Sequence, residues 1–87
     1  MIPRMALPTE PITLSVEQIS ELHRKLVVLR HDVNNQLSLI MATVELMRRR
    51  PENTERMLIT LVEQPHKISE SIAQFSGAME STLGITR

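Results

Sequence analysis

The chain has 87 residues, enough for one small domain. Ten basic residues balance ten acidic ones, which argues against a general nucleic-acid binder because such proteins need excess positive charge. The lack of cysteine excludes a disulfide scaffold and a thiolate zinc site, and two glycines are too few for a phosphate-cradling loop. No apolar run approaches the roughly 20 residues of a membrane span. We therefore expect a cytoplasmic chain that binds neither membrane nor nucleic acid and holds no cofactor of its own.

Residues 1–14 contain three of the five prolines, namely Pro3, Pro8 and Pro11. Each proline removes a backbone donor and disfavours the helical conformation at the residue before it. The sequence therefore predicts an extended arm over residues 1–14, ahead of the helical part of the chain.

A first helix is predicted to begin after Ser15 and to run to about Arg50. Ser15 and Gln18 have the spacing of a capping box, in which each side chain accepts a hydrogen bond from the backbone amide of the other. No Pro or Gly follows until Pro51, and apolar residues recur at steps of three and four, which is typical of a coiled-coil-like seam. The seam residues are Ile19, Leu22, Leu26, Leu29, Val33, Leu37, Ile40, Val44 and Met47.

A turn over residues 51–54 and a second helix to about Thr82 follow. Asn53 or Thr54 is expected to cap this helix, and Pro51 alternatively suits its first turn. The apolar seam of this helix consists of Leu58, Leu61, Pro65, Ile68, Ile72, Phe75 and Met79. Pro65 is expected to bend the helix or to open its hydrogen bonding, and Gly84 is expected to end it, leaving residues 84–87 as a tail.

Two long helices joined by a short turn predict an all-α fold, an antiparallel hairpin over residues 15–83. A hairpin cannot cover both of its seams, so we expect two copies to pair as a homodimeric four-helix bundle. The two helices also differ in charge: residues 16–50 carry six basic and four acidic groups, whereas residues 51–87 carry three basic and five acidic groups. This bias favours contact between the helices only weakly, because exposed ion pairs contribute little.

The residues that could carry chemistry lie in the middle of the first helix. On a helical wheel His31 points away from the neighbouring seam residues, and Asn35, four residues later, stands one turn above it. Asp32 follows His31 directly, and Gln36 completes the polar stretch. The alternative interpretation is a solvated polar stripe without reactivity.

Other polar and apolar residues near this stretch have simpler interpretations. His23 and His66 lack such neighbours, and no two histidines stand four residues apart, so a helical zinc site is not expected. Val27 and Val28, one turn before His31, form either an apolar collar for a docking protein or a contact with the other subunit. The simplest interpretation of three nearby cations, Arg24, Lys25 and Arg30, is a solvated helix face. Arg30 is also suited to attract an acidic partner.

The polar stretch around His31 suits phosphoryl transfer. An imidazole is nucleophilic at neutral pH, because its unperturbed pKa is about 6.5. A carboxylate at Asp32 can accept a hydrogen bond from one ring nitrogen and so fix the tautomer in which the other nitrogen attacks. An amide at Asn35 or Gln36 can donate to a phosphoryl oxygen or hold a water in line. These four residues are therefore the candidate catalytic set.

The stretch His31-Asp32-Val33-Asn34-Asn35-Gln36-Leu37 resembles the H-box of a known family. The family is the dimerization and histidine phosphotransfer (DHp) domain of bacterial sensor histidine kinases, whose H-box commonly reads His-Glu/Asp-x-x-Asn/Thr-Pro-Leu. The resemblance, which covers about residues 15–82, implies that His31 accepts the phosphoryl group, Asp32 is its acidic partner and Asn35 assists kinase or phosphatase chemistry. A related branch uses His-Asp-x-x-x-Gln, which Gln36 matches. We rank Asn35 first because Gln36 lies about 140° from His31 around the helix.

The resemblance implies a two-component signalling protein. Its partner would be the receiver domain of a response regulator, which it would phosphorylate or dephosphorylate, and any Mg²⁺ would belong to that receiver. Gln36 replaces the common proline, and the Gly-rich boxes of the family's ATP-binding domain are absent. Phosphorylation from ATP would therefore need a kinase ATP-binding domain in trans.

Two further alternatives concern what kind of molecule this is. Met1 and the complete hairpin favour a free-standing protein over a kinase fragment. The alternative function is a non-catalytic dimerisation or adaptor module derived from a DHp domain. An unrelated helical bundle, in which the motif at His31 is a coincidence, is a third possibility.

Overall fold

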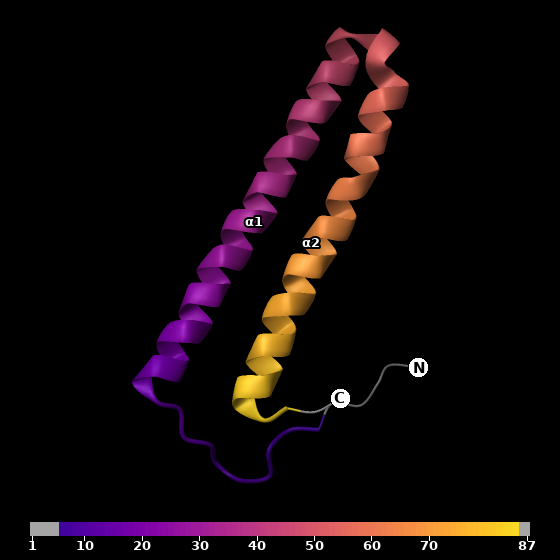
Figure 1. Cartoon of the computed structure of the whole chain (residues 1–87). Helices are drawn as coiled ribbons and strands as arrows, with labels where there is room; N and C mark the ends of the chain where they lie inside the picture. The colour runs from indigo at the N-terminus through magenta and orange to yellow at the C-terminus, as the bar shows by residue number, and fades with distance from the viewer. Residues whose placement is uncertain (1–5, 86–87) are drawn as a thin grey trace.

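The computed structural model of the chain describes residues 6–85. Two long helices, α1 (Val16–Arg49) and α2 (Thr54–Leu83), are joined by the short 3-10 helix η1 (Pro51–Asn53). The helices lie side by side and antiparallel, with the turn at one end and both free ends at the other (Figure 1). The predicted all-α hairpin is confirmed. The parts of the predicted arm and tail at residues 1–5 and 86–87 lie outside the described residues.

The capping box predicted at the start of α1 is present. The Ser15 hydroxyl accepts from the backbone N–H of Gln18 at 3.1 Å, and the Gln18 side-chain oxygen accepts from the backbone N–H of Ser15 at 2.8 Å. Two orphan amides of the first turn are satisfied in this way, so α1 begins sharply after Ser15. Its last turn carries Arg48 and Arg49, whose charge complements the helix dipole.

Neither candidate cap of α2 acts as expected. Asn53 occupies the position before the helix, but its side chain makes no capping hydrogen bond. The Thr54 hydroxyl donates backwards to the carbonyl of Pro51 at 2.7 Å, away from the amides of the first turn that a cap would satisfy. Pro51 instead opens η1, where its missing N–H costs nothing.

The second helix continues through Pro65 and ends at Gly84. Helical structure is unbroken on both sides of the proline, so Pro65 does not end or divide α2. Gly84 has φ 70°, a left-handed conformation that glycine adopts without strain. The backbone N–H of Ile85 then donates to the carbonyl of Glu80 at 2.8 Å, which completes a Schellman-type end.

The hairpin is a single layer of helices, only 12 Å across in its thinnest direction. Among the described residues no apolar side chain is fully buried, and the two buried side chains are polar: Thr43 (3% exposed) and Gln64 (1% exposed). Five members of the α1 seam turn toward α2 and are half-buried: Leu22, Leu29, Val33, Ile40 and Met47. They pack against the half-buried α2 residues Leu61, Ile68 and Phe75.

Six of the remaining seam residues form what we call the apolar face, which lies on one side of the hairpin, while Met79 is half-buried and Pro65 is exposed. Its members, between 37% and 54% exposed, are Ile19, Leu26, Leu37, Val44, Leu58 and Ile72. On each helix these positions follow the half-buried ones by about 55–60° in the same rotational sense. Because the helices are antiparallel, equal rotations along each chain point to the same side of the pair. The predicted seams are therefore each split between an internal contact and an uncovered apolar face.

Candidate functional site

His31 stands on the side of α1 that is turned away from α2. Its side chain is 73% exposed, near the middle of a helix of 34 residues. The seam residues on either side of it, Leu29 and Val33, are half-buried against α2, and a helix places His31 about 200° from each of them. The imidazole is therefore open to solvent and to an approaching protein.

Asp32 and Asn35 both approach the same ring atom of His31. Asp32 Oδ1 lies 3.8 Å from His31 Nδ1, and Asn35 Nδ2 lies 3.5 Å from it. The first distance is too long for a hydrogen bond and the second is at its outer limit, so small side-chain rotations decide which contact forms. We call these three residues the His31 cluster.

Gln36 lies apart from the His31 cluster. It is half-buried on the side of α1 that faces α2, and its side-chain oxygen is buried without a hydrogen-bond partner among the described residues. Of the two amides considered from the sequence, Asn35 is the one that the structure brings to the imidazole.

A groove of about 290 Å³ runs between α1 and α2 beside the His31 cluster. It is lined by Arg24, Lys25, Val28, Leu29 and Asp32 from α1, and by Ser71, Gln74, Phe75 and Ala78 from α2. On a helical wheel these residues lie on the side opposite the apolar face, and Asn35 leans toward the same side. Asp32 therefore belongs both to the groove and to the His31 cluster.

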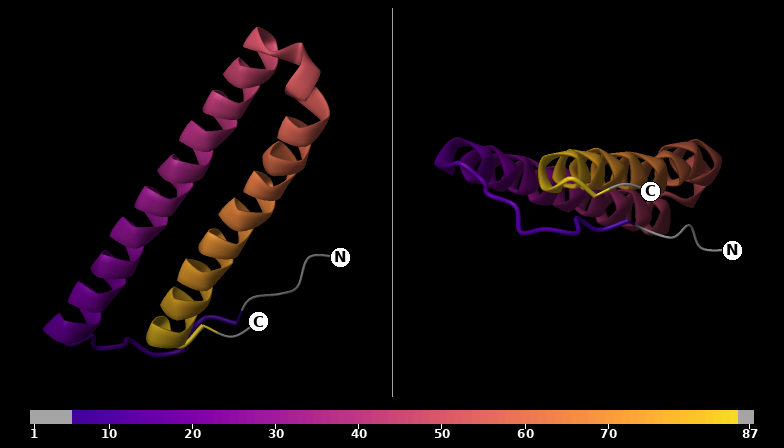
Figure 2. Two further views of the ribbon diagram at one scale, coloured as in Figure 1. Left: turned by 45° about the horizontal axis from the view of Figure 1, so that its top comes forward. Right: turned by 90° about the horizontal axis from the view of Figure 1, so that it is seen from below.

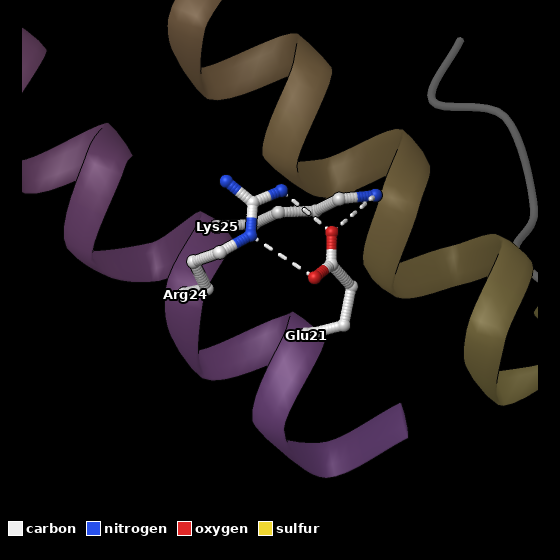
Figure 3. A network of polar contacts seen from close by, with 3 residues as sticks. All are labelled: Glu21, Arg24 and Lys25. Atoms are coloured by element: carbon white, nitrogen blue, oxygen red, sulfur yellow. Dashed lines mark hydrogen bonds and ion pairs between the residues drawn. The ribbon is translucent and has the colours of Figure 1, made fainter. Parts of the chain in front are cut away.

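Glu21 forms ion pairs with the two cations at one end of the groove, Arg24 and Lys25. The Glu21 carboxylate accepts hydrogen bonds from Arg24 Nε at 3.0 Å and Arg24 Nη2 at 2.6 Å, and Lys25 Nζ lies 4.0 Å from it (Figure 3). The hydrogen bonds and charge of Arg24 lower the pKa of Glu21 below its ordinary value, and the same contact raises the pKa of Arg24. Arg24 and Lys25, interpreted from the sequence as a solvated face, are thus organised on one wall of the groove.

The α2 wall of the groove was not anticipated from the sequence. Ser71, Gln74 and Ala78 have no motif character, and only the pairing of the two helices places them opposite Val28 and Asp32. A register argument counted from the turn could have found them, because a short turn fixes which residues of an antiparallel pair stand level.

Comparisons with known proteins leave the chain without an assigned family. No family model matches the sequence, and no curated protein and no solved structure is significantly similar to it. Within residues 6–85, neither helix combines the length and hydropathy needed to cross a membrane. The same residues contain no group of three or more potential ligands that could hold a metal ion.

Proposed function

We propose that this chain is a cytoplasmic phosphotransfer protein of two-component signalling. In this proposal His31 exchanges a phosphoryl group with the phosphorylated aspartate of a receiver domain, or the cluster helps to hydrolyse that phosphoaspartate. The observation that carries the proposal is the His31 cluster itself. It combines a 73% exposed imidazole in mid-helix with a carboxylate 3.8 Å and an amide 3.5 Å from its Nδ1 atom.

The chemistry assigned to His31 is an in-line displacement. The lone pair of Nε2 attacks phosphorus, the bond between phosphorus and the receiver's aspartate oxygen breaks, and the aspartate leaves as a carboxylate. Asp32 favours the proton on Nδ1 and stabilises the positive ring that forms on attack. The Asn35 amide is close enough to donate to a phosphoryl oxygen or to orient a water for the hydrolytic reaction.

The groove is the surface on which we expect the receiver to dock. It adjoins the His31 cluster and offers apolar contacts at Val28, Leu29 and Phe75, beside the cations Arg24 and Lys25. Receiver phosphorylation sites are acidic, so the basic end of the groove favours their approach. Any Mg²⁺ needed for the reaction would be supplied by the receiver, and phosphoryl groups originating from ATP would require a kinase domain in trans.

We also propose that two copies pair through the apolar face as a four-helix bundle. The six residues of this face are all partly exposed in the single chain, and covering them would remove apolar surface from water. The groove and the His31 cluster lie elsewhere on the helices, so pairing would leave both accessible.

The test is phosphoryl exchange with a panel of phosphorylated receiver domains. We expect at least one receiver to lose its label faster with the wild-type chain, and we expect His31→Ala to abolish the effect. His23→Ala is the matched control, because His23 is also an exposed histidine of α1 and lies two turns away from the His31 cluster. Equal rates with wild type and His31→Ala would contradict the proposal. Receiver binding that survives His31→Ala without any exchange would favour the adaptor alternative.

A further inference from the structure

The free end of the hairpin is bridged by the segment that precedes α1. The turn connects the helices at one end. At the other end, the start of α1 at Val16 and the end of α2 at Leu83 are not joined directly. Residues 6–15, which are the described part of the predicted arm together with the capping residue Ser15, leave the start of α1 and run across to the end of α2 (Figures 1 and 2). The arm precedes α1 in the sequence but lies beside the C-terminal end of α2.

Specific contacts hold the arm at the end of α2. A Cβ atom placed on Gly84 would lie 3.9 Å from Cγ of Pro8, so the proline ring lies beside the glycine turn, within contact distance of a methyl group added there. A shallow apolar depression of about 370 Å³ is shared by the two segments. Its lining consists of Leu7, Pro8, Glu10, Pro11 and Ile12 from the arm and of Leu83 and Ile85 from the end of α2.

Both segments are suited to this contact by their backbone chemistry. The left-handed turn at Gly84 and the bond from Ile85 N–H to Glu80 turn Ile85 back beside the helix, where it is half-buried. Pro8 and Pro11 restrict the arm to extended conformations before it packs, which reduces the entropy lost on docking.

We propose that the arm is a clasp that ties the free end of α1 to the free end of α2 and limits their separation. The groove residues nearest the free end of the hairpin are Arg24 on α1 and Ala78 on α2, and Ala78 is five residues before the end of α2 at Leu83. We therefore expect release of the clasp to widen the groove at its basic end, on which a docking receiver would depend. The clasp itself stands on the contacts at Gly84, and only its effect on receiver docking rests on the proposed function.

Hydrogen exchange on the full chain tests the clasp without any partner. The double variant Leu7→Asp/Ile12→Asp places charge in the apolar depression. We expect amide exchange near residues 19–30 and 74–83 to become about fivefold faster or more, with exchange near the turn unchanged. The control Thr9→Asp/Thr13→Asp adds the same charge to exposed arm positions outside the depression and should behave as wild type. Unchanged exchange at the free ends, or equal acceleration along the whole chain, would overturn the proposal.

A cross-link provides a second, direct measurement of the contact between the arm and the end of α2. The chain has no cysteine, so Pro8→Cys/Gly84→Cys introduces one possible pair, and mild oxidation should give an intramolecular disulfide. Pro8→Cys/Gly77→Cys is the control, because a Cβ at Gly77 meets no atom within 4 Å. No cross-link, or one that joins two chains, would contradict a clasp within one chain. Neither experiment involves phosphate, so phosphotransfer can fail while the clasp stands.

Discussion

At the scale of single residues, the tautomer of His31 depends on which neighbour forms a hydrogen bond with its Nδ1 atom. Asp32 Oδ1 and Asn35 Nδ2 lie 3.8 and 3.5 Å from that nitrogen. If Nδ1 carries the proton and donates it to Asp32, the lone pair is on Nε2 and points into solvent as a nucleophile. If the Asn35 amide donates to Nδ1, the proton sits on Nε2 and the exposed nitrogen cannot attack. Under the proposed function, the reactive tautomer therefore requires a side-chain rotation that brings the Asp32 carboxylate closer to Nδ1 than 3.8 Å.

Asp32→Asn should slow phosphorylation of His31 while leaving the fold intact. The amide keeps the shape of the carboxylate but loses the charge that favours the Nδ1 proton. We expect the initial rate to fall at least about tenfold, because positioned acid–base groups typically contribute about 10²–10⁴-fold and Asp32 acts through the imidazole. Phosphohistidine formed from phosphoramidate and followed by ³¹P NMR provides the measurement. Glu45→Gln, a charge loss remote from His31 where Glu45 pairs with Arg48 and Arg49, should match wild type; equal rates for both variants would refute the role of Asp32.

Arg24→Gln should raise the pKa of Glu21 toward its ordinary value. In the wild type the hydrogen bonds from Arg24 are the largest cause of the lowered pKa. Because the pKa of Glu21 is lower in the folded state, the contact with Arg24 stabilises the fold at pH values above the ordinary carboxyl pKa of 4.5. This contribution is lost as the pH falls through the lower pKa of the folded state. The carboxyl ¹³C shift of Glu21, titrated in both proteins, measures the change. An unaltered titration midpoint would show that the contact does not persist in solution.

At the scale of the elements, α2 carries its most buried polar group beside its proline. Gln64 is 1% exposed, its amide nitrogen donates to the Thr60 carbonyl at 2.8 Å, and its oxygen is buried without a partner among the described residues. A buried acceptor without a donor typically costs about 1–3 kcal/mol. The hairpin thus carries a local penalty where an apolar side chain would fit the seam.

Gln64→Met should therefore raise the melting temperature. Methionine has a similar volume and no acceptor to satisfy. We expect a gain of about 1 kcal/mol, or roughly 4–8 °C for a domain of this size. Gln74→Met at an exposed position of the same helix is the control for helix propensity. Thermal unfolding followed by circular dichroism measures the melting temperatures. If Gln64→Met lowers the melting temperature and Gln74→Met does not, the side-chain oxygen of Gln64 has a partner such as water.

The two glycines near the end of α2 should respond oppositely to alanine. Gly77 lies within the helix, and a Cβ added there would meet no atom within 4 Å, so Gly77→Ala should stabilise the chain by about 0.5–1 kcal/mol through helix propensity. Gly84 has φ 70°, so Gly84→Ala should destabilise it by about 1 kcal/mol through backbone strain. Urea unfolding of both variants measures the pair. Shifts of the same sign would contradict this difference in backbone conformation.

At the scale of the whole molecule, one thin layer of two helices presents two unlike sides. One side is the apolar face, and the other holds the groove with its cations, hydroxyl and amide groups. A hairpin only 12 Å thick has little interior of its own, and small domains bury a modest share of their surface. Association through the apolar face would supply the missing core.

Leu26→Glu/Ile72→Glu should convert a dimer into monomers. Both residues lie on the apolar face, and pairing would force two charges into an apolar contact. Light scattering after size exclusion should give about twice the chain mass of 9.9 kDa for wild type and the single-chain mass for the variant. Ile59→Glu, at an exposed apolar residue that points away from α1, should stay dimeric. A monomeric wild type would contradict the proposed bundle.

The helix termini show where local sequence is sufficient and where it is not. The capping box of Ser15 and Gln18 was predicted correctly because both partners lie within one turn of the chain. At the start of α2, Asn53 takes the N-cap position that was one of the predicted alternatives, but its side chain makes no capping hydrogen bond, and the Thr54 hydroxyl donates back to the Pro51 carbonyl. Side-chain preference alone does not reveal such backbone geometry.

The sequence by itself determined the two helices, their antiparallel pairing and the outward position of His31, because helical periodicity assigns every residue to a side of its own helix. The tertiary structure decided which seam residues face α2, that Gln36 turns inward, and that residues of both helices form the groove beside Asp32. It also placed the arm against Gly84. These features depend on the rotation of one helix against the other and on contacts between residues distant in the chain, which no local pattern encodes.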